Sequence, residues 1–237
     1  MGILVQRVCA RVPQRAYCFS ELHARRLREE GARGEVRVLR GLFTGGPPEP
    51  TRGPREPLIV FAGRLIPEKR VTLAIAALAL ARHKVEGLRG VVFGDGPERG
   101  ALEAAIVEHG LNETVRAAGF AAGAEVEETM GRAECMLLTS SREGYGMVVV
   151  EAAAHGTPSV VVAGEDNAAT ELIEEGANGS IAPTAEPEAI AEAIERVHAG
   201  GEALRESTMA WYQRHAEELS LETSLRTVLS DYASARE

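Results

Sequence analysis

The sequence predicts an α/β protein with a doubly wound, Rossmann-like parallel sheet, and three observations support this. Five short runs that are almost continuously apolar recur between residues 58 and 163, as in strands that are covered on both faces. Longer segments rich in Ala, Glu, Leu and Ile separate them and are typical of helices. The alternation is strict over about 140 residues. Alternation of this kind predicts right-handed crossovers and one parallel sheet.

Each apolar run is assigned to one strand and each intervening segment to one helix. The predicted strands are Leu58–Ala62, Gly90–Phe93, Val115–Ala118, Cys135–Thr139 and Ser159–Ala163. The predicted helices are Glu68–Val85, Glu98–His109, Ala124–Ala133, Val148–His155, Ala168–Glu175 and Glu188–Ala199. Ligands of doubly wound sheets bind beyond the carboxyl ends of the strands, so we expect the site in the loops that follow the strands.

The two ends of the chain follow a different pattern. Two short strands are predicted near 15–19 and 35–39, around a helix over Glu21–Glu30 that Ser20 could cap. So few elements cannot bury a core alone. The predicted organisation is a front segment over 1–44, a Pro/Gly-rich linker over 45–57, a Rossmann-like domain over 58–206 and C-terminal helices over 207–237.

Composition excludes several classes of protein. The 237 residues are 45% hydrophobic and 26% charged, which is enough to build a folded core. No stretch approaches the roughly 18 apolar residues of a membrane span, and Arg7 and Arg11 interrupt what would be a signal peptide, so we expect a cytoplasmic protein. The three cysteines and six histidines match no disulfide or zinc spacing, and no metal site is expected.

The net charge of −9 is unevenly distributed. Residues 1–56 hold eleven arginines and six glutamates, a net of +5, and the remainder carries −14. An acidic body argues against a nucleic-acid partner, because binding to phosphates needs a basic face. The basic front could be a solvated helix surface, or it could make peripheral contact with an anionic membrane.

The segment GRLIPEK at 63–69 directly follows the first strand of the sheet. Gly63 permits a turn, and Arg64 and Lys69 add two cations at the start of the next helix, where N–H groups and the helix dipole already favour an anion. Cations in that position cost stability, so the pattern indicates an anion site. The alternative is that Arg64 pairs with Glu68 and nothing binds.

Two further glycine or polar turns follow strands. FGDGPERG at 93–100 is similar to the dinucleotide fingerprint G-x-G-x-x-G, but Gly100 falls one position late. This turn could contact a ligand or could simply be a tight connection from strand to helix. In GEDNAATE at 164–171, Asp166 or Asn167 is predicted to cap a helix.

The segment SSREGYGMVVVE at 140–151 combines glycines with two carboxylates. Gly144 and Gly146 flank Tyr145 and permit backbone amides to point into a cleft. Glu143 precedes the predicted helix and Glu151 lies one to two turns inside it, so both can face one pocket. Carboxylates accept hydrogen bonds from pairs of sugar hydroxyls. The alternative is a solvated Glu143 and a Glu151 that pairs locally.

Together these segments resemble the nucleotide-sugar-binding half of the retaining GT-B glycosyltransferases of family 4, the glycosyl transferases group 1. The resemblance is continuous over about Pro57–Ala199. The matching segments, in chain order, are GRLIPEK (63–69), FGDGPE (93–98), SSREGYGMVVVEAAAHGTPSVV (140–161) and NAATELIEEGANG (167–179).

The resemblance implies a metal-independent hexosyltransferase of class EC 2.4 that retains the anomeric configuration of a UDP-, GDP- or ADP-sugar and needs no cofactor. By the same resemblance, the catalytic residues are Arg64 and Lys69, which clamp the donor diphosphate, and Glu143, which contacts the sugar. Glu151 would hold the ribose hydroxyls. The other implied donor-binding residues are Gly63, Gly119, Phe120, Gly144, Tyr145, Gly146, Met147 and Val148.

The resemblance also assigns residues 1–44 to the end of an acceptor-binding domain whose remainder is missing. We therefore expect a truncated enzyme that is inactive or incomplete alone, and that pairs with an acceptor domain or forms a homodimer through an exposed hinge face. Two other functions stay open. One is a non-catalytic protein-interaction module that keeps the fold, and the other is a dinucleotide-dependent oxidoreductase suggested only by the off-register glycines.

Overall fold

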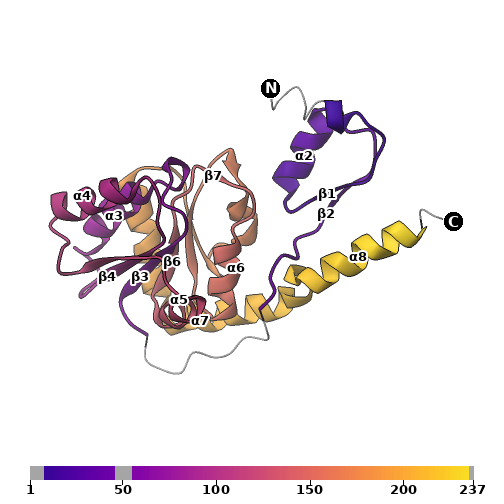
Figure 1. Cartoon of the computed structure of the whole chain (residues 1–237). Coiled ribbons are helices and arrows are strands. Elements are labelled where there is room, and N and C mark those ends of the chain that lie inside the picture. Colours follow the sequence, from indigo (N-terminus) through magenta and orange to yellow (C-terminus); the bar gives the residue numbers. More distant parts are fainter. Residues whose placement is uncertain (1–7, 46–54, 235–237) are drawn as a thin grey trace. The chain divides into compact units, whose positions relative to one another are not determined.

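The computed structural model describes residues 8–45 and 55–234, and its contacts divide the chain into two units (Figure 1). The larger unit comprises Pro47–Arg214. The smaller unit combines Met1–Gly46 with His215–Glu237, so it is assembled from both ends of the chain.

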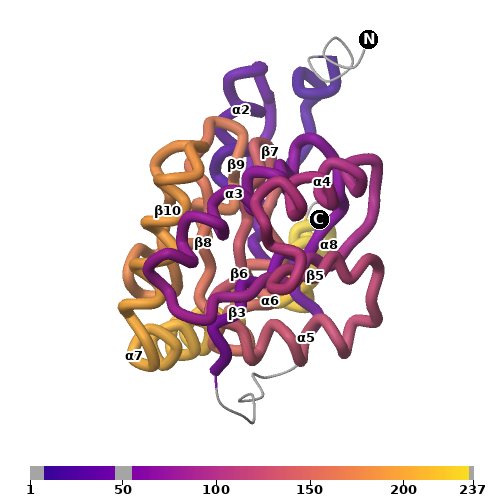
Figure 2. The backbone as a smooth tube through the Cα atoms, turned by 90° about the vertical axis from the view of Figure 1, so that its left-hand side faces the viewer, coloured from indigo at the N-terminus to yellow at the C-terminus, as the bar shows by residue number. Residues whose placement is uncertain are grey.

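The larger unit contains a six-stranded parallel sheet in the order β10-β8-β6-β3-β4-β5 (Figure 2). Its strands are β3 (Leu58–Ala62), β4 (Arg89–Phe93), β5 (Val115–Gly119), β6 (Cys135–Leu138), β8 (Ser159–Val162) and β10 (Gly179–Ala182). From β3 the chain moves outward to β5, then returns to β6 and moves outward in the other direction. The predicted doubly wound parallel sheet is confirmed, with its switch point between β3 and β6.

Helices cover both faces of this sheet, which explains why its strands are continuously apolar (Figure 1). One face packs against α3 (Val71–Ala81), α4 (Arg99–Glu108) and the first half of α7 (Pro187–Leu219). The other face packs against α5 (Gly123–Arg132) and α6 (Met147–Ala154).

The single helix predicted over Glu68–Val85 is wrong. The chain forms a 3-10 turn, η1 (Pro67–Lys69), and α3 begins only after Arg70, which adopts a left-handed conformation with φ 48°. The Thr139 hydroxyl donates to the carbonyls of Lys69 and Arg70 at 2.8 and 3.1 Å. These carbonyls turn toward Thr139, and the backbone is interrupted there. Lys69 therefore lies in the turn before the helix.

The helix predicted over Ala168–Glu175 is also wrong. Only a 3-10 turn forms, η2 (Ala168–Leu172), and Asn167 caps it by accepting from the Ala169 amide at 3.1 Å, as predicted. The Asn178 side chain then ends the turn, because it donates to the Leu172 carbonyl and accepts from the Glu174 amide, both at 2.8 Å.

Three short strands and one long helix differ from the expected pattern. The sequence did not predict β10, nor the two-residue strands β7 (Arg142–Glu143) and β9 (Asp166–Asn167), which pair in parallel. The helix predicted over Glu188–Ala199 continues as α7 to Leu219, interrupted at Gly201, where φ is 55°.

The smaller unit pairs β1 (Ala16–Cys18) with β2 (Val36–Val38) in parallel, with α2 (Glu21–Glu29) between them. Ser20 caps α2 as predicted, accepting from the His23 amide. Asp231 of α8 (Leu221–Ser234) accepts hydrogen bonds from Arg37 at 2.8 and 2.9 Å and from the Tyr17 hydroxyl at 2.9 Å. This carboxylate fastens the end of the chain to the strands near its beginning.

Most of the predicted linker, residues 46–54, lies outside the described residues. Its last residues are bound to the larger unit, since the Glu56 amide donates to the Arg132 carbonyl at 2.9 Å and Arg55 forms an ion pair with the buried Glu134. None of the described helices is long and apolar enough to cross a membrane.

A pair of glycine substitutions tests the tight turn after β4. Gly94 has φ 125°, and a Cβ there would overlap the Gly63 carbonyl oxygen, so Gly94→Ala should lower the free energy of unfolding by more than about 2 kcal/mol. Gly100 lies in α4 with open space around it, and Gly100→Ala should raise stability by up to about 1 kcal/mol. Urea denaturation measures both changes, and equal stability of the two variants would contradict this account of the turn.

Candidate functional site

Three of the predicted site residues, Arg64, Lys69 and Glu143, lie at the switch point of the sheet. Strands β3 and β6 are neighbours there, and the connections that follow them leave toward opposite faces. The loop after β3 supplies Arg64 and Lys69, and the loop after β6 supplies Glu143. In doubly wound sheets this crevice at the carboxyl ends of the strands is where ligands bind.

Lys69 and Glu143 form an ion pair across the switch point, between Nζ and Oε2. Their side chains are only 16% and 15% exposed, so solvent screens the pair less than an ordinary surface pair. The Ser140 hydroxyl donates to the same carboxylate oxygen at 3.2 Å. The expectation of a solvated Glu143 is therefore wrong, because this carboxylate has a fixed position beside a lysine.

Further hydrogen bonds join the loops after β3 and β6. The buried Thr139 hydroxyl binds two carbonyls of the β3 loop, and its own carbonyl accepts from Arg70 Nε at 2.6 Å. The Ser141 amide donates to the Glu68 carbonyl at 2.8 Å. These contacts hold the backbone on either side of Lys69 and leave its side chain to reach Glu143.

Asn167 connects the loop after β8 to the same cluster. Its side chain is 1% exposed and donates to the carbonyls of Ser140 and Val162 at 3.2 and 2.8 Å. In the β7–β9 pair, Glu143 lies opposite Asn167. The position of Glu143 is thus fixed by backbone pairing as well as by its side-chain partners.

Arg64 contrasts with Lys69. Its side chain is exposed, and within the described part of the chain its guanidinium has no hydrogen-bond or ion-pair partner. The predicted alternative in which Arg64 pairs with Glu68 is therefore wrong for the described residues. The switch point presents one cation that is already neutralised and one that is available to an anion.

The Gly94–Gly96 turn after β4 supports this loop. The Leu65 amide donates to the Asp95 carbonyl and the Leu65 carbonyl accepts from the Glu98 amide, both at 2.9 Å. Both glycines have positive φ and pack against backbone of the β3 loop. A tight connection from strand to helix therefore accounts for the positions of these glycines, and nothing further supports a dinucleotide-binding turn.

The first turn of α6 opens at the same edge of the sheet. Gly146 enters it with φ 98°, and a Cβ there would lie 2.6 Å from the Ala169 side chain. The Tyr145 side chain is buried at 6% exposure, while Gly144 beside it is exposed. The Val149 amide donates to the Gly146 carbonyl at 2.8 Å, and the amides of this first turn form the positive end of the helix dipole.

Glu151 lies in α6 and is partly buried. Burial raises the pKa of its carboxyl group, and the negative charge of Glu127 raises it further. A carboxylate of this kind gains from hydrogen-bond donors that a ligand brings, because the described residues do not compensate for its lost hydration.

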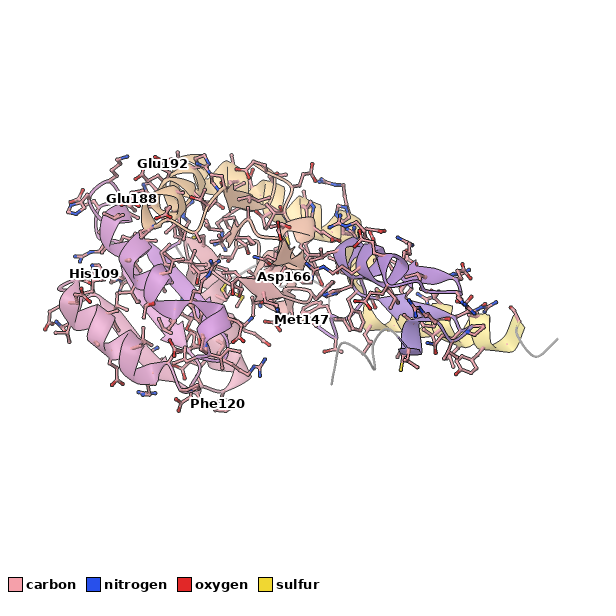
Figure 3. All side chains as sticks on the ribbon, turned by 90° about the horizontal axis from the view of Figure 1, so that it is seen from above. His109, Phe120, Met147, Asp166, Glu188 and Glu192 are labelled. Atoms are coloured by element: carbon pink, nitrogen blue, oxygen red, sulfur yellow. The ribbon has the colours of Figure 1, made fainter. Side chains whose placement is uncertain are left out.

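The far end of the predicted site lies on the edge strand β5. Gly119 has φ 74° and ends the strand, and the Phe120 ring is 90% exposed. Figure 3 accordingly shows Phe120 at the margin of the larger unit, apart from Met147 and Asp166. Three strand spacings, about 14 Å, separate β5 from β6, so the predicted residues extend along the sheet edge and do not form one compact cluster.

Thr139, Ser140 and Asn167 are the residues whose roles sequence reasoning missed. The available signal was a polar run, Thr139 to Ser141, that directly follows four buried apolar residues of β6. No group of three or more His, Cys, Asp or Glu side chains that could hold a metal ion occurs in residues 8–45 and 55–234. The positive charge near the switch point is that of the site's own arginine and lysine residues.

Comparisons with known proteins agree on one family. The family model described as "Glycosyl transferases group 1" matches residues 47–214. A D-inositol 3-phosphate glycosyltransferase of Jonesia denitrificans is 30% identical over 190 residues, which cover 77% of this chain and 44% of the relative. An alpha-D-kanosaminyltransferase of Streptomyces kanamyceticus is 31% identical over 141 residues, 60% of this chain and 36% of the relative. The chain therefore spans less than half the length of these relatives.

Solved structures of similar fold cover almost the whole chain. The pneumococcal O-GlcNAc transferase GtfA, in complex with UDP and GlcNAc, has a TM-score of 0.83 at 18% identity, covering 98% of this chain and 47% of that one. The Anabaena protein HepE, in complex with UDP, has a TM-score of 0.79 at 20% identity, covering 99% and 68%. At these identities the similarity establishes the fold.

The raised pKa of Glu151 predicts a pH-dependent gain in stability for Glu151→Gln. The folded protein holds this proton more tightly than the unfolded chain, so the wild-type free energy of unfolding falls as the pH rises from the ordinary pKa of 4.5 through the raised value. Above that window Glu151→Gln should be the more stable protein, and below about pH 4 the difference should vanish. Urea denaturation between about pH 4 and about pH 8 measures this difference.

The exposed Glu113 provides the matched control, since Glu113→Gln removes the same charge without relieving a buried carboxylate. A stability gain that is the same at every pH, or that Glu113→Gln reproduces, would contradict the burial argument for Glu151.

Proposed function

The chain belongs to the glycosyl transferases group 1 family, and from this premise we propose that its larger unit binds a nucleoside diphosphate sugar as the donor for sugar transfer. The fold is that of GT-B glycosyltransferases. The observation that carries the proposal is the available cation Arg64 beside Lys69, at the switch point and next to the first turn of α6. Two cations and a helix N-terminus together favour a doubly charged anion such as a diphosphate.

In the proposed mechanism, Arg64 and Lys69 stabilise the leaving group. Breaking the bond between the sugar and the diphosphate increases the negative charge on the phosphate oxygen that departs. Fixed cations and backbone amides that already point at that oxygen lower the barrier, because they need no reorganisation as the charge develops. A metal ion is not required for this role, and we propose that these residues take it.

The rest of the donor follows the edge of the sheet in this proposal. Glu143 and the loop around Gly144 contact the sugar, and Glu151 accepts hydrogen bonds from the ribose hydroxyls. The loop at Gly119 and Phe120 lies beside the base. Support comes from the placement of these residues along one edge of the sheet, which suits an elongated ligand. Glu143 follows β6, Arg64 and Lys69 follow β3, and Gly119 ends β5. The structures of GtfA and HepE were both solved in complex with UDP, in agreement with a donor of this class.

We further propose that the donor is a hexose nucleotide and that its anomeric configuration is retained. The acceptor would be held by a second domain, to which the smaller unit belongs. Transfer requires the acceptor to be held opposite the donor, so these 237 residues alone should bind donor and transfer little. Robust transfer by the purified chain would contradict the need for a further domain.

Calorimetric titration with UDP, GDP and ADP tests the proposal directly. At least one nucleotide should bind the wild-type chain, and Arg64→Ala and Lys69→Ala should each weaken that binding at least about tenfold, as expected for the loss of a charged hydrogen bond.

The chain offers a matched control in its other lysine, Lys84, which is 67% exposed and pairs with Glu195 at 2.8 Å. Lys84→Ala should leave the affinity unchanged. If none of the three nucleotides binds, or if Lys84→Ala is as damaging as Lys69→Ala, the proposed diphosphate site is wrong.

A further inference from the structure

The Lys69–Glu143 ion pair creates a conflict with anion binding. The lysine ammonium already has an anionic partner in the protein, in contact with Glu143 Oε2. A phosphate oxygen that approaches Lys69 must share this ammonium with the carboxylate or displace it. The phosphate and the Glu143 carboxylate would then lie close together. Because the Lys69 and Glu143 side chains are only 16% and 15% exposed, solvent screens the repulsion between the two negative groups weakly.

We infer that Glu143 is an internal competitor for Lys69, which weakens the binding of a nucleoside diphosphate that carries no sugar. The inference rests on the proposed function, in which the diphosphate contacts Lys69. It adds a second role for Glu143 that acts through the lysine, before any contact with a sugar.

The residues around Glu143 hold its carboxylate in place, so an arriving diphosphate competes with it for Lys69 and does not simply displace it. Ser140 donates to the oxygen that faces Lys69, and the β7–β9 pairing fixes the backbone of Glu143. Ser140 is itself buried, and Asn167 holds its carbonyl at 3.2 Å. The carboxylate therefore has little freedom to turn away when a diphosphate arrives, and its negative charge stays near the lysine.

A donor and a product differ in what they offer this carboxylate. A nucleotide sugar brings hydroxyl groups, which can donate to Glu143 and compensate for the loss of Lys69. A nucleoside diphosphate brings only further negative charge. After the sugar has left, Lys69 can return to Glu143, and the diphosphate loses one of its two cations. The ion pair thus favours the loaded donor over the spent nucleotide and promotes product release.

The test is nucleotide binding to Glu143→Gln, measured by calorimetry with whichever of UDP, GDP and ADP the wild-type chain binds most tightly. Because glutamine keeps the shape and removes the charge, the variant should bind the nucleoside diphosphate about tenfold more tightly than wild type, by the scale of a charged hydrogen bond. Weaker or unchanged binding by a variant that unfolds at the wild-type temperature overturns the inference.

Two further variants separate competition from a general charge effect. Glu68 is exposed and precedes Lys69 in η1, so Glu68→Gln removes the same charge nearby and should change the affinity less than about twofold. In a Lys69→Gln background, adding Glu143→Gln should give a clearly smaller gain, because only the direct repulsion between carboxylate and phosphate remains and no shared ammonium is released. An equal gain from Glu68→Gln, or a gain of undiminished size without Lys69, overturns the inference.

Failure of the proposed function has a different signature. In that case the wild-type chain and all variants bind none of the three nucleotides, and both proposals fall together. Binding by wild type with no gain in Glu143→Gln overturns only the competition and leaves the donor site standing.

Discussion

The buried hydroxyl of Thr139 provides the interaction on which the arrangement of the site depends. By donating to the carbonyls of Lys69 and Arg70, it stops the helix that would otherwise begin at Pro67 and ties the loop after β3 to the loop after β6. In a continuous helix, the helical repeat would set the direction of the Lys69 side chain. The interruption instead leaves Lys69 in a turn, where it reaches the carboxylate of the neighbouring loop. The Thr139 hydroxyl therefore joins two loops that the strand order makes neighbours, and it places Lys69 within reach of Glu143.

Local sequence patterns were enough for most of the fold, because its five predicted strands are mainly apolar and those at the centre of the sheet are buried on both faces. The errors occur where distant residues decide the local conformation. Residues 69–70 are separated from Thr139 by about 70 positions, and no local pattern reveals that contact. Strand β10 has only four residues, Gly-Ser-Ile-Ala, and it exists because it pairs with β8. Its sequence alone does not distinguish a strand from a loop.

The candidate site could be predicted by residue type but not by pairing. Glycine turns, two cations and two carboxylates at strand ends pointed to loops that the structure places along one edge of the sheet, because parallel strands bring their carboxyl ends to one edge. That Lys69 meets Glu143, 74 residues away, follows only from the strand order. One of these features opposes stability, namely the partly buried carboxylate of Glu151, whose pKa is raised by burial. Such conflicts between local preference and fold are expected where residues serve a ligand.

The smaller unit has a consequence for how the chain acquires its structure. Its strands come from residues 16–38 and its closing helix from residues 221–234, joined through Asp231. During synthesis the first strands emerge long before their partner, and the whole larger unit is made in between. The larger unit has its own core and can fold first, whereas the smaller unit must wait for nearly the last residues of this sequence. Closing so long a loop carries an entropic cost, but this cost grows only with the logarithm of loop length. A shortened α8 would therefore leave the early strands without the carboxylate that holds them, although every residue of those strands is intact.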